Sequence, residues 1–153
     1  RSTLFPYTTL FRSRTGYAVI ARQWKKNDKV EVTLPMEVRK VTANEKVKDD
    51  AGKIALQRGP IMYCAEWIDN DGKTSNLFIP PATQFNYEYK TDLLNGVVIL
   101  KAEVPAVIIK GDNISTIKQS FTAIPYYSWA NRGKGEMNVW FPQQVKDILL
   151  LTN

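Results

Sequence analysis

The sequence predicts an all-β protein: an antiparallel, jelly-roll-like β-sandwich with a partial β-hairpin unit before it. Short segments rich in β-branched and aromatic residues recur along the chain, as in strands. Glycine and proline turn signals separate these segments at regular spacing, which is typical of a sandwich. Residues 145–151 offer the one candidate for a helix. A domain with so little helix is expected to form its core between packed sheets.

A β-hairpin is expected before the main sandwich. Residues 16–24 (GYAVIARQW) form a strand candidate, residues 25–28 a polar turn, and residues 29–34 a second strand. Apolar and polar residues alternate strictly in the second strand, which marks a strand with one buried face. Pro35 ends the hairpin, because proline cannot donate a hydrogen bond to a central ladder.

The next strands flank a polar segment. Residues 38–41 form a short strand, and residues 42–52 (TANEKVKDDAG) have the composition of a linker between two β units. Two further strands are expected at residues 53–58 and 61–67, and the Gly-Pro pair between them is a turn or bulge signal.

Two turn signals organise the following stretch. Residues 69–72 (DNDG) form a strong turn, and the Asn-Gly pair at 95–96 is typical of a hairpin. The strand candidates around them are residues 77–79, 85–89, 97–102 and 107–110. The last two are apolar on both faces, as expected between packed sheets.

The C-terminal part combines aromatic residues with glycines. Residues 121–129 (FTAIPYYSW) are aromatic, residues 131–135 (NRGKG) form a glycine loop, and residues 136–141 (EMNVWF) are expected to be a closing strand. Residues 145–151 are apolar and fit either a last strand or a short helix.

Three parts are expected along the chain. Residues 1–13 (RSTLFPYTTLFRS) nearly repeat themselves and resemble the in-frame translation of a common sequencing adapter, so we expect them to be non-native. Residues 14–41 are expected to be the end of a middle β domain, and residues 42–153 a C-terminal β-sandwich domain. The reading frame is then expected to have lost an upstream part, which leaves the localisation open.

The composition argues against several functions. The chain has no histidine, which removes the usual general base and the commonest zinc ligand. The net charge of +6 invites a nucleic-acid partner, but lysines and arginines are scattered among acids, so we expect none. No apolar run approaches the ~20 residues that a membrane helix needs, so no membrane association is expected.

The acids and the single cysteine indicate no catalytic or metal site. Two carboxylates usually flank the bond in glycoside hydrolysis. The spacing of the available acids singles out no such pair: Glu66, Asp69, Asp71, Glu103 and Glu136. Residues 69–72 resemble the start of a calcium loop, but Pro80 stands where that loop needs a bidentate glutamate. Cys64 lies in an apolar strand without a basic neighbour, so we expect it to be inert packing.

Four aromatic residues are the candidates for binding. Tyr126, Tyr127, Trp129 and Trp140 gather in sequence around the glycine loop. Aromatic faces can stack on sugar rings, and loops at the edge of a sandwich commonly carry binding sites. Packing in the core or at a domain interface explains the same residues, so both sugar contact and interface stay open.

Three segments together resemble glycoside hydrolase family 127. They are GYAVIARQWKKNDKVEVTLPMEVRKV, the region around ALQRGPIMYCAE at residues 55–66, and AIPYYSWANRGKGEM at residues 123–137. The resemblance runs over residues 16–142. It implies a parent enzyme of the β-L-arabinofuranosidase type, with an N-terminal (α/α)6 catalytic barrel followed by β-sandwich domains.

The resemblance also implies that the chemistry lies outside this chain. The family uses a cysteine nucleophile in a vicinal cysteine pair, a zinc ion held by cysteines and a glutamate, and a glutamate general acid, all in the barrel. Cys64 matches a cysteine of the β region and not the nucleophile, so no catalytic residue, metal ligand or cofactor is assigned here.

Three functions follow from the sequence, in order of preference. The first is an inactive accessory β-sandwich that packs against the catalytic barrel or another subunit, a homo-oligomer included. The second is a carbohydrate-binding module that holds an arabinose-containing glycan through tryptophan and tyrosine. The third is an independent small enzyme.

Overall fold

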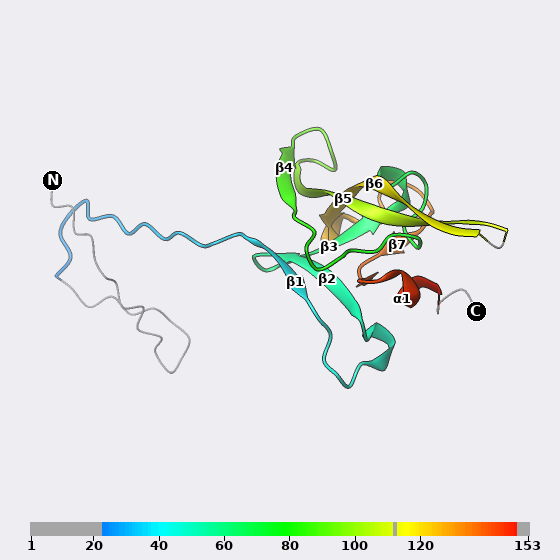
Figure 1. The fold of residues 1–153 in the computed structure, drawn as a ribbon. Coiled ribbons are helices and arrows are strands. Elements are labelled where there is room, and N and C mark those ends of the chain that lie inside the picture. Colours follow the sequence, from blue (N-terminus) through cyan, green and yellow to red (C-terminus); the bar gives the residue numbers. More distant parts are fainter. Residues whose placement is uncertain (1–22, 112, 150–153) are drawn as a thin grey trace. The chain divides into compact units, whose positions relative to one another are not determined.

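The computed structural model describes residues 23–111 and 113–149, which fall into two compact units with a border between Thr33 and Leu34 (Figure 1). Each unit is described by itself. In the described part, no helix is long and apolar enough to cross a membrane.

The first unit contributes a turn but no strand in its described residues. The polar turn expected at 25–28 is formed: Asp28 N donates to Lys25 O at 3.1 Å, and Lys25 N donates to the Asp28 carboxylate at 2.8 Å. The prediction of a strand at residues 29–34 is wrong, because these residues form no ladder and Leu34 is 74% exposed. Alternation defines which face a strand would bury, but a strand also needs a hydrogen-bonded neighbour. Most of the other expected hairpin strand, residues 16–22, lies outside the described residues.

The second unit is built on an antiparallel sheet. Its strands are β1 (Val38–Val41), β2 (Lys53–Arg58), β3 (Ile61–Glu66), β4 (Asn86–Lys90), β5 (Val97–Lys110), β6 (Asn113–Pro125), β7 (Met137–Asn138) and β8 (Phe141–Pro142). The order in the sheet is β1-β2-β3-β6-β5-β4, with β7 paired to β3 and β8 paired to β2. The expected all-β, antiparallel class is therefore confirmed.

The strand β1 belongs to the same sheet as β2. The two pair from Val38 with Arg58 to Val41 with Ala55, and residues 42–52 with the 3-10 helix η1 (Lys48–Asp50) connect them. The border expected after Val41 therefore falls inside this unit, between two paired strands. A polar composition indicates only that a segment is exposed to solvent. A connection within a hairpin is as exposed as a linker between domains, so composition does not distinguish the two. The assignment of the preceding residues to a middle domain stays a prediction.

The hairpin of β5 and β6 is longer than the sequence suggested. Residues 97–102 and 107–110 were expected as separate strands, but β5 runs through both without a break. The strand β6 starts at Asn113 and includes a polar stretch before the aromatic segment. This stretch is a strand because it pairs with β5 over its whole length. Its polar composition gives no local signal of a strand.

The core lies on both faces of the central strand β3. Tyr63 packs in the larger cluster with Leu100, Phe121 and other buried residues, whereas Cys64 packs in a second cluster with Val97 and Ile124. Neighbouring residues of a strand point to opposite faces, so both faces of β3 are covered. The curled sheet therefore has the sandwich-like character that the sequence predicted.

The C-terminal segment closes the unit with short elements. The expected closing strand at residues 136–141 is divided into the two-residue strands β7 and β8. Of the two alternatives for the tail, the helix is formed, as α1 (Val145–Leu149). Its Ile148 packs against Phe78 and Val107 in a third apolar cluster.

Candidate functional site

Arg132 is the centre of an ionic cluster at one end of β3. Its Nε donates to Glu66 Oε2 at 3.0 Å and its Nη1 donates to Asp69 Oδ1 at 2.9 Å. Its Nη2 contacts a carboxylate oxygen of both acids. The other oxygen of Glu66 accepts from Ala130 N at 2.8 Å. Glu66 is buried and the Arg132 side chain is 15% exposed, so this cluster fastens the glycine loop to the end of β3.

The elements around this cluster are short and tightly turned. The strand β3 ends at Glu66, and the 3-10 helix η2 (Trp67–Asp69) follows at once. The strand β6 similarly runs into the 3-10 helix η3 (Tyr126–Ser128). The turn expected at residues 69–72 is formed, with φ of 53° at Asp71 and 80° at Gly72. Glycine and aspartate tolerate this left-handed backbone.

Asn70 ties the turn to β6. Its Nδ2 donates to Glu66 O at 2.7 Å and to Thr122 O at 2.9 Å, while its Oδ1 accepts from Thr122 N at 3.0 Å. The side chain is fully buried, and buried amides are usually satisfied in this way. Residues 69–72 therefore form a structural turn. Among the described residues, no group of three possible metal ligands is found.

A cleft of about 410 Å³ lies beside the cluster, between Trp67 and Trp129. Gly135 forms part of its lining and lies directly against the Trp67 ring, so that a Cβ at Gly135 would stand 1.9 Å from the indole. Tyr126 stacks on Trp129, with ring centroids 6.1 Å apart and an interplanar angle of 18°. The cleft thus combines two indoles with a stretch of glycine backbone.

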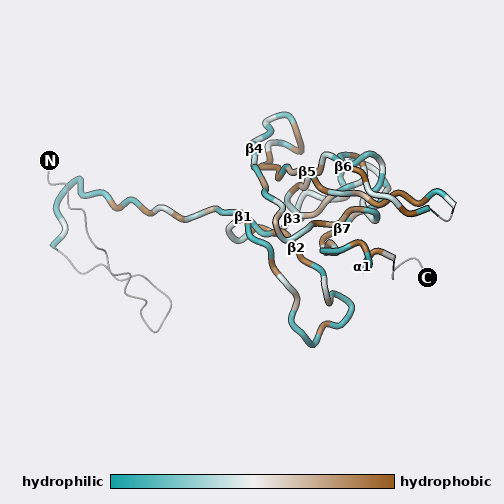
Figure 2. The backbone as a smooth tube through the Cα atoms, in the orientation of Figure 1, coloured by the Kyte–Doolittle hydropathy of each residue, from teal (hydrophilic) through white to brown (hydrophobic). Residues whose placement is uncertain are grey.

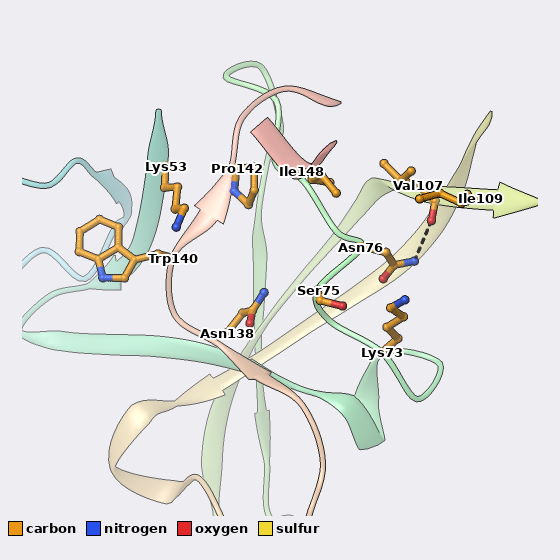
Figure 3. A pocket seen from close by; sticks show the side chains of 10 residues that line it. All are labelled: Lys53, Lys73, Ser75, Asn76, Val107, Ile109, Asn138, Trp140, Pro142 and Ile148. Carbon is orange, nitrogen blue, oxygen red and sulfur yellow. Dashed lines mark hydrogen bonds between the residues drawn. The ribbon is translucent and has the colours of Figure 1, made fainter. Parts of the chain in front are cut away.

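The four aromatic candidates do not form one site. Tyr126 and Trp129 are stacked and Tyr127 beside them is exposed. Trp140 instead lines a second cavity of about 470 Å³, together with Lys53, Asn138 and others (Figure 3). Sequence reasoning missed Trp67 at the first cleft, although its position between a strand and the turn at 69–72 is a signal that could have found it.

The other carboxylates differ in their environment. Glu136 accepts hydrogen bonds from Thr74 N and Ser75 N, each at 2.9 Å. Asp71 and Glu103 are exposed. The expected surface and turn acids are thus found at these positions, whereas Glu66 and Asp69 belong to the ionic cluster that the sequence did not reveal.

Cys64 is a buried free thiol. Its side chain is buried on β3, and this desolvation, with the nearby negative charge of Glu66, raises the pKa of the thiol to about 12. Since the thiolate is the reactive form, the chemistry of Cys64 agrees with a role in packing.

Glu136 is expected to make the stability of the domain sensitive to acid. Desolvation raises the pKa of Glu136, but the hydrogen bonds from Thr74 and Ser75 and the nearby charge of Lys73 together outweigh it and hold the pKa below the ordinary 4.5. Its stabilising contribution is therefore complete above pH 4.5 and is lost as the pH falls through the lower, folded-state pKa. We expect Glu136→Gln to reduce the loss of stability between about pH 5 and pH 3, measured by urea unfolding at each pH. The exposed Glu103→Gln is the matched control, and equal pH profiles for Glu136→Gln and the unchanged protein would contradict the assignment.

The chain is similar in sequence and fold to known proteins. Residues 38–142 match the family model described as the glycoside hydrolase family 127 C-terminal domain. The non-reducing end β-L-arabinofuranosidase of Bifidobacterium longum is 35% identical over 124 residues, which cover 72% of this chain and 19% of that protein.

Solved structures agree with this match. A GH127 β-L-arabinofuranosidase from Geobacillus stearothermophilus T6 superposes with a TM-score of 0.78 at 40% identity, covering 86% of this chain and 22% of that one. Another GH127 β-arabinofuranosidase superposes with a TM-score of 0.82 at 42% identity, covering 88% and 21%. The chain thus spans about a fifth of the length of these relatives. It belongs to glycoside hydrolase family 127, and residues 38–142 correspond to the C-terminal domain of its β-L-arabinofuranosidase-like enzymes.

Proposed function

We propose that this domain is a non-catalytic accessory β-sandwich that packs against the (α/α)6 catalytic barrel of its parent enzyme or against another subunit. The parent would hydrolyse arabinose-containing glycans. An inactive domain is supported by two acids, Glu66 and Glu136, whose carboxylates are held in hydrogen bonds within the domain. Both oxygens of Glu66 bind Ala130 N or Arg132, and Glu136 binds two backbone amides. A general acid has to exchange a proton with substrate, which these fixed contacts oppose.

The zinc chemistry of the family does not fit the residues present. A zinc site needs several thiolate, imidazole or carboxylate ligands. Cys64 is the only cysteine of the chain, histidine is absent, and the Cys64 thiol is buried with a raised pKa. These residues therefore do not fit the zinc site of the family.

The proposal predicts that the purified chain releases no product from 4-nitrophenyl β-L-arabinofuranoside above the buffer rate. The measurement is absorbance of the released nitrophenolate over hours at high protein concentration. Turnover that the unchanged chain shows and Glu136→Gln abolishes would overturn the proposal. The exposed Glu103→Gln serves as the control, because it removes an acid of similar exposure from β5.

A carbohydrate-binding role is the second candidate, and the cleft between Trp67 and Trp129 favours it. Aromatic faces provide flat apolar surface for sugar rings, and the stacked Tyr126 fixes the orientation of Trp129. Titration with arabino-oligosaccharides, followed by tryptophan fluorescence, tests this role. Binding that Trp129→Ala removes and Trp140→Ala leaves intact would support it, since Trp140 lines the other cavity. An unchanged signal at millimolar sugar would count against it.

A further inference from the structure

The cleft between Trp67 and Trp129 differs from the other exposed apolar surface of the domain. Figure 2 shows hydrophobic stretches along β5 and β6, where Ile114 and Ile117 are 51% and 48% exposed. These isoleucines offer apolar contact alone. The cleft instead places charged side chains and glycine backbone beside two indoles, so it can recognise a ligand by hydrogen bonds as well as by contact.

The aromatic walls of the cleft are held in place by the domain itself. Trp129 is 42% exposed, and the Tyr126 ring stacks on it. Gly135 lies directly against the Trp67 ring, where a Cβ would overlap the indole. The cleft volume of about 410 Å³ lies within the range of about 300–1,000 Å³ that is usual for small-ligand sites. Rigid aromatic faces of this kind suit the apolar face of a sugar ring.

Of the two carboxylates that line the cleft, Glu136 is the one with capacity left for a ligand. Glu66 also lines it, but both of its oxygens are bound within the ionic cluster. Glu136 is exposed, and its hydrogen bonds from Thr74 N and Ser75 N both go to Oε2. An ionised carboxylate offers about four acceptor positions. Glu136 can therefore accept hydrogen bonds from a ligand through Oε1 while Oε2 fixes the side chain.

Opposite charges line the cleft, which favours a neutral ligand. Arg132 neutralises Glu66, and Lys134 lines the same cleft as Glu136. An anion would meet Glu136 and a cation would meet Lys134, and either ion would give up hydration on entry. A neutral ligand with several hydroxyl groups can donate to Glu136 and accept from Lys134. A sugar combines such hydroxyl groups with an apolar ring face.

We propose that Glu136 is the specificity-determining residue of a neutral-sugar site in this cleft, where its carboxylate accepts hydrogen bonds from hydroxyl groups of a ring that stacks on Trp129. This inference rests on the proposed carbohydrate-binding role and names the group that selects the ligand. The indoles supply contact area that any sugar ring can use. The carboxylate distinguishes sugars by the position of their hydroxyl groups, because an acceptor that finds no donor in a desolvated site loses its hydrogen bond to water.

The test titrates the full chain with methyl β-L-arabinofuranoside and with its 2-deoxy, 3-deoxy and 5-deoxy analogues, and it follows the indole N–H signals by NMR. We expect at least one deoxy analogue to bind the unchanged chain about tenfold more weakly than the parent sugar, as for a hydrogen bond to a charged group. Glu136→Gln should bind the parent sugar about tenfold more weakly and should no longer distinguish it from that analogue. This cycle isolates the contact between carboxylate and hydroxyl. The matched control is Glu103→Gln, an exposed acid on β5, which should leave every affinity unchanged.

The outcomes separate this inference from the role on which it rests. If the unchanged chain binds none of the four sugars, the carbohydrate-binding role and the inference both fail, and the accessory function stands alone. If the parent sugar binds, and Glu136→Gln ranks the four sugars as the unchanged chain does, the binding role stands and Glu136 does not select the ligand. Tetramethylammonium is titrated as a cation without hydroxyl groups, since aromatic sites can also bind such ions. Tighter binding of this cation than of the sugar would overturn the inference.

Discussion

Replacing Arg132 with methionine is expected to lower the free energy of unfolding by about 3–5 kcal/mol, the cost of removing one partner from a buried ion pair. Methionine keeps much of the aliphatic volume but leaves the buried Glu66 without its main counter-charge. It also leaves Asp69 with one partner fewer. Urea unfolding followed by tryptophan fluorescence measures the change.

Two further variants test the origin of this effect. Arg132→Lys keeps the charge but cannot reproduce the fork that reaches both acids, so its stability should lie between those of Arg132→Met and the unchanged protein. Lys134→Met removes an exposed lysine from the same loop and should change stability by no more than about 0.5 kcal/mol. A loss below about 1 kcal/mol for Arg132→Met would show that the ionic cluster does not hold the loop.

The ionic cluster also shows why parts of the site escaped prediction. Glu66 and Asp69 are close in sequence to each other but far from Arg132, and nothing local signals that the three converge. The contact between Trp67 and Gly135 also could not be predicted, because these residues are far apart in the sequence. Tyr126 and Trp129 were found together because a single 3-10 turn brings them into contact.

The same contrast between local and long-range contacts explains which strands could be predicted from the sequence. The bounds of β2 and the Asn95-Gly96 turn were predicted because each follows from local composition and turn chemistry. The polar start of β6 was missed because only its pairing with β5 makes it a strand. The opposite error occurred at residues 29–34, where alternation was present but no partner strand is formed in the described residues. Strands depend on tertiary context more than helices do.

Replacing Phe121 with alanine is expected to cost about 3–5 kcal/mol, as for large-to-small changes of buried aromatics. The Phe121 ring is fully buried. It packs edge-to-face against Phe85, with centroids 6.0 Å apart, and against Phe141, with centroids 5.4 Å apart. Phe121 thus joins three separate segments: the residue before β4, the strand β6 and the short strand β8.

Truncating Phe121 is expected to cost more stability than truncating its neighbour Phe85. Phe85 is only partly buried, so Phe85→Ala should cost clearly less than Phe121→Ala in the same urea experiment. Phe121→Leu keeps most of the apolar volume and loses the two edge-to-face contacts, which are worth about 0.5–1.5 kcal/mol each beyond burial. If Phe121→Ala cost no more than Phe85→Ala, the core would not be centred on this ring. The two-residue strand β8 would then be held mainly by its pairing with β2.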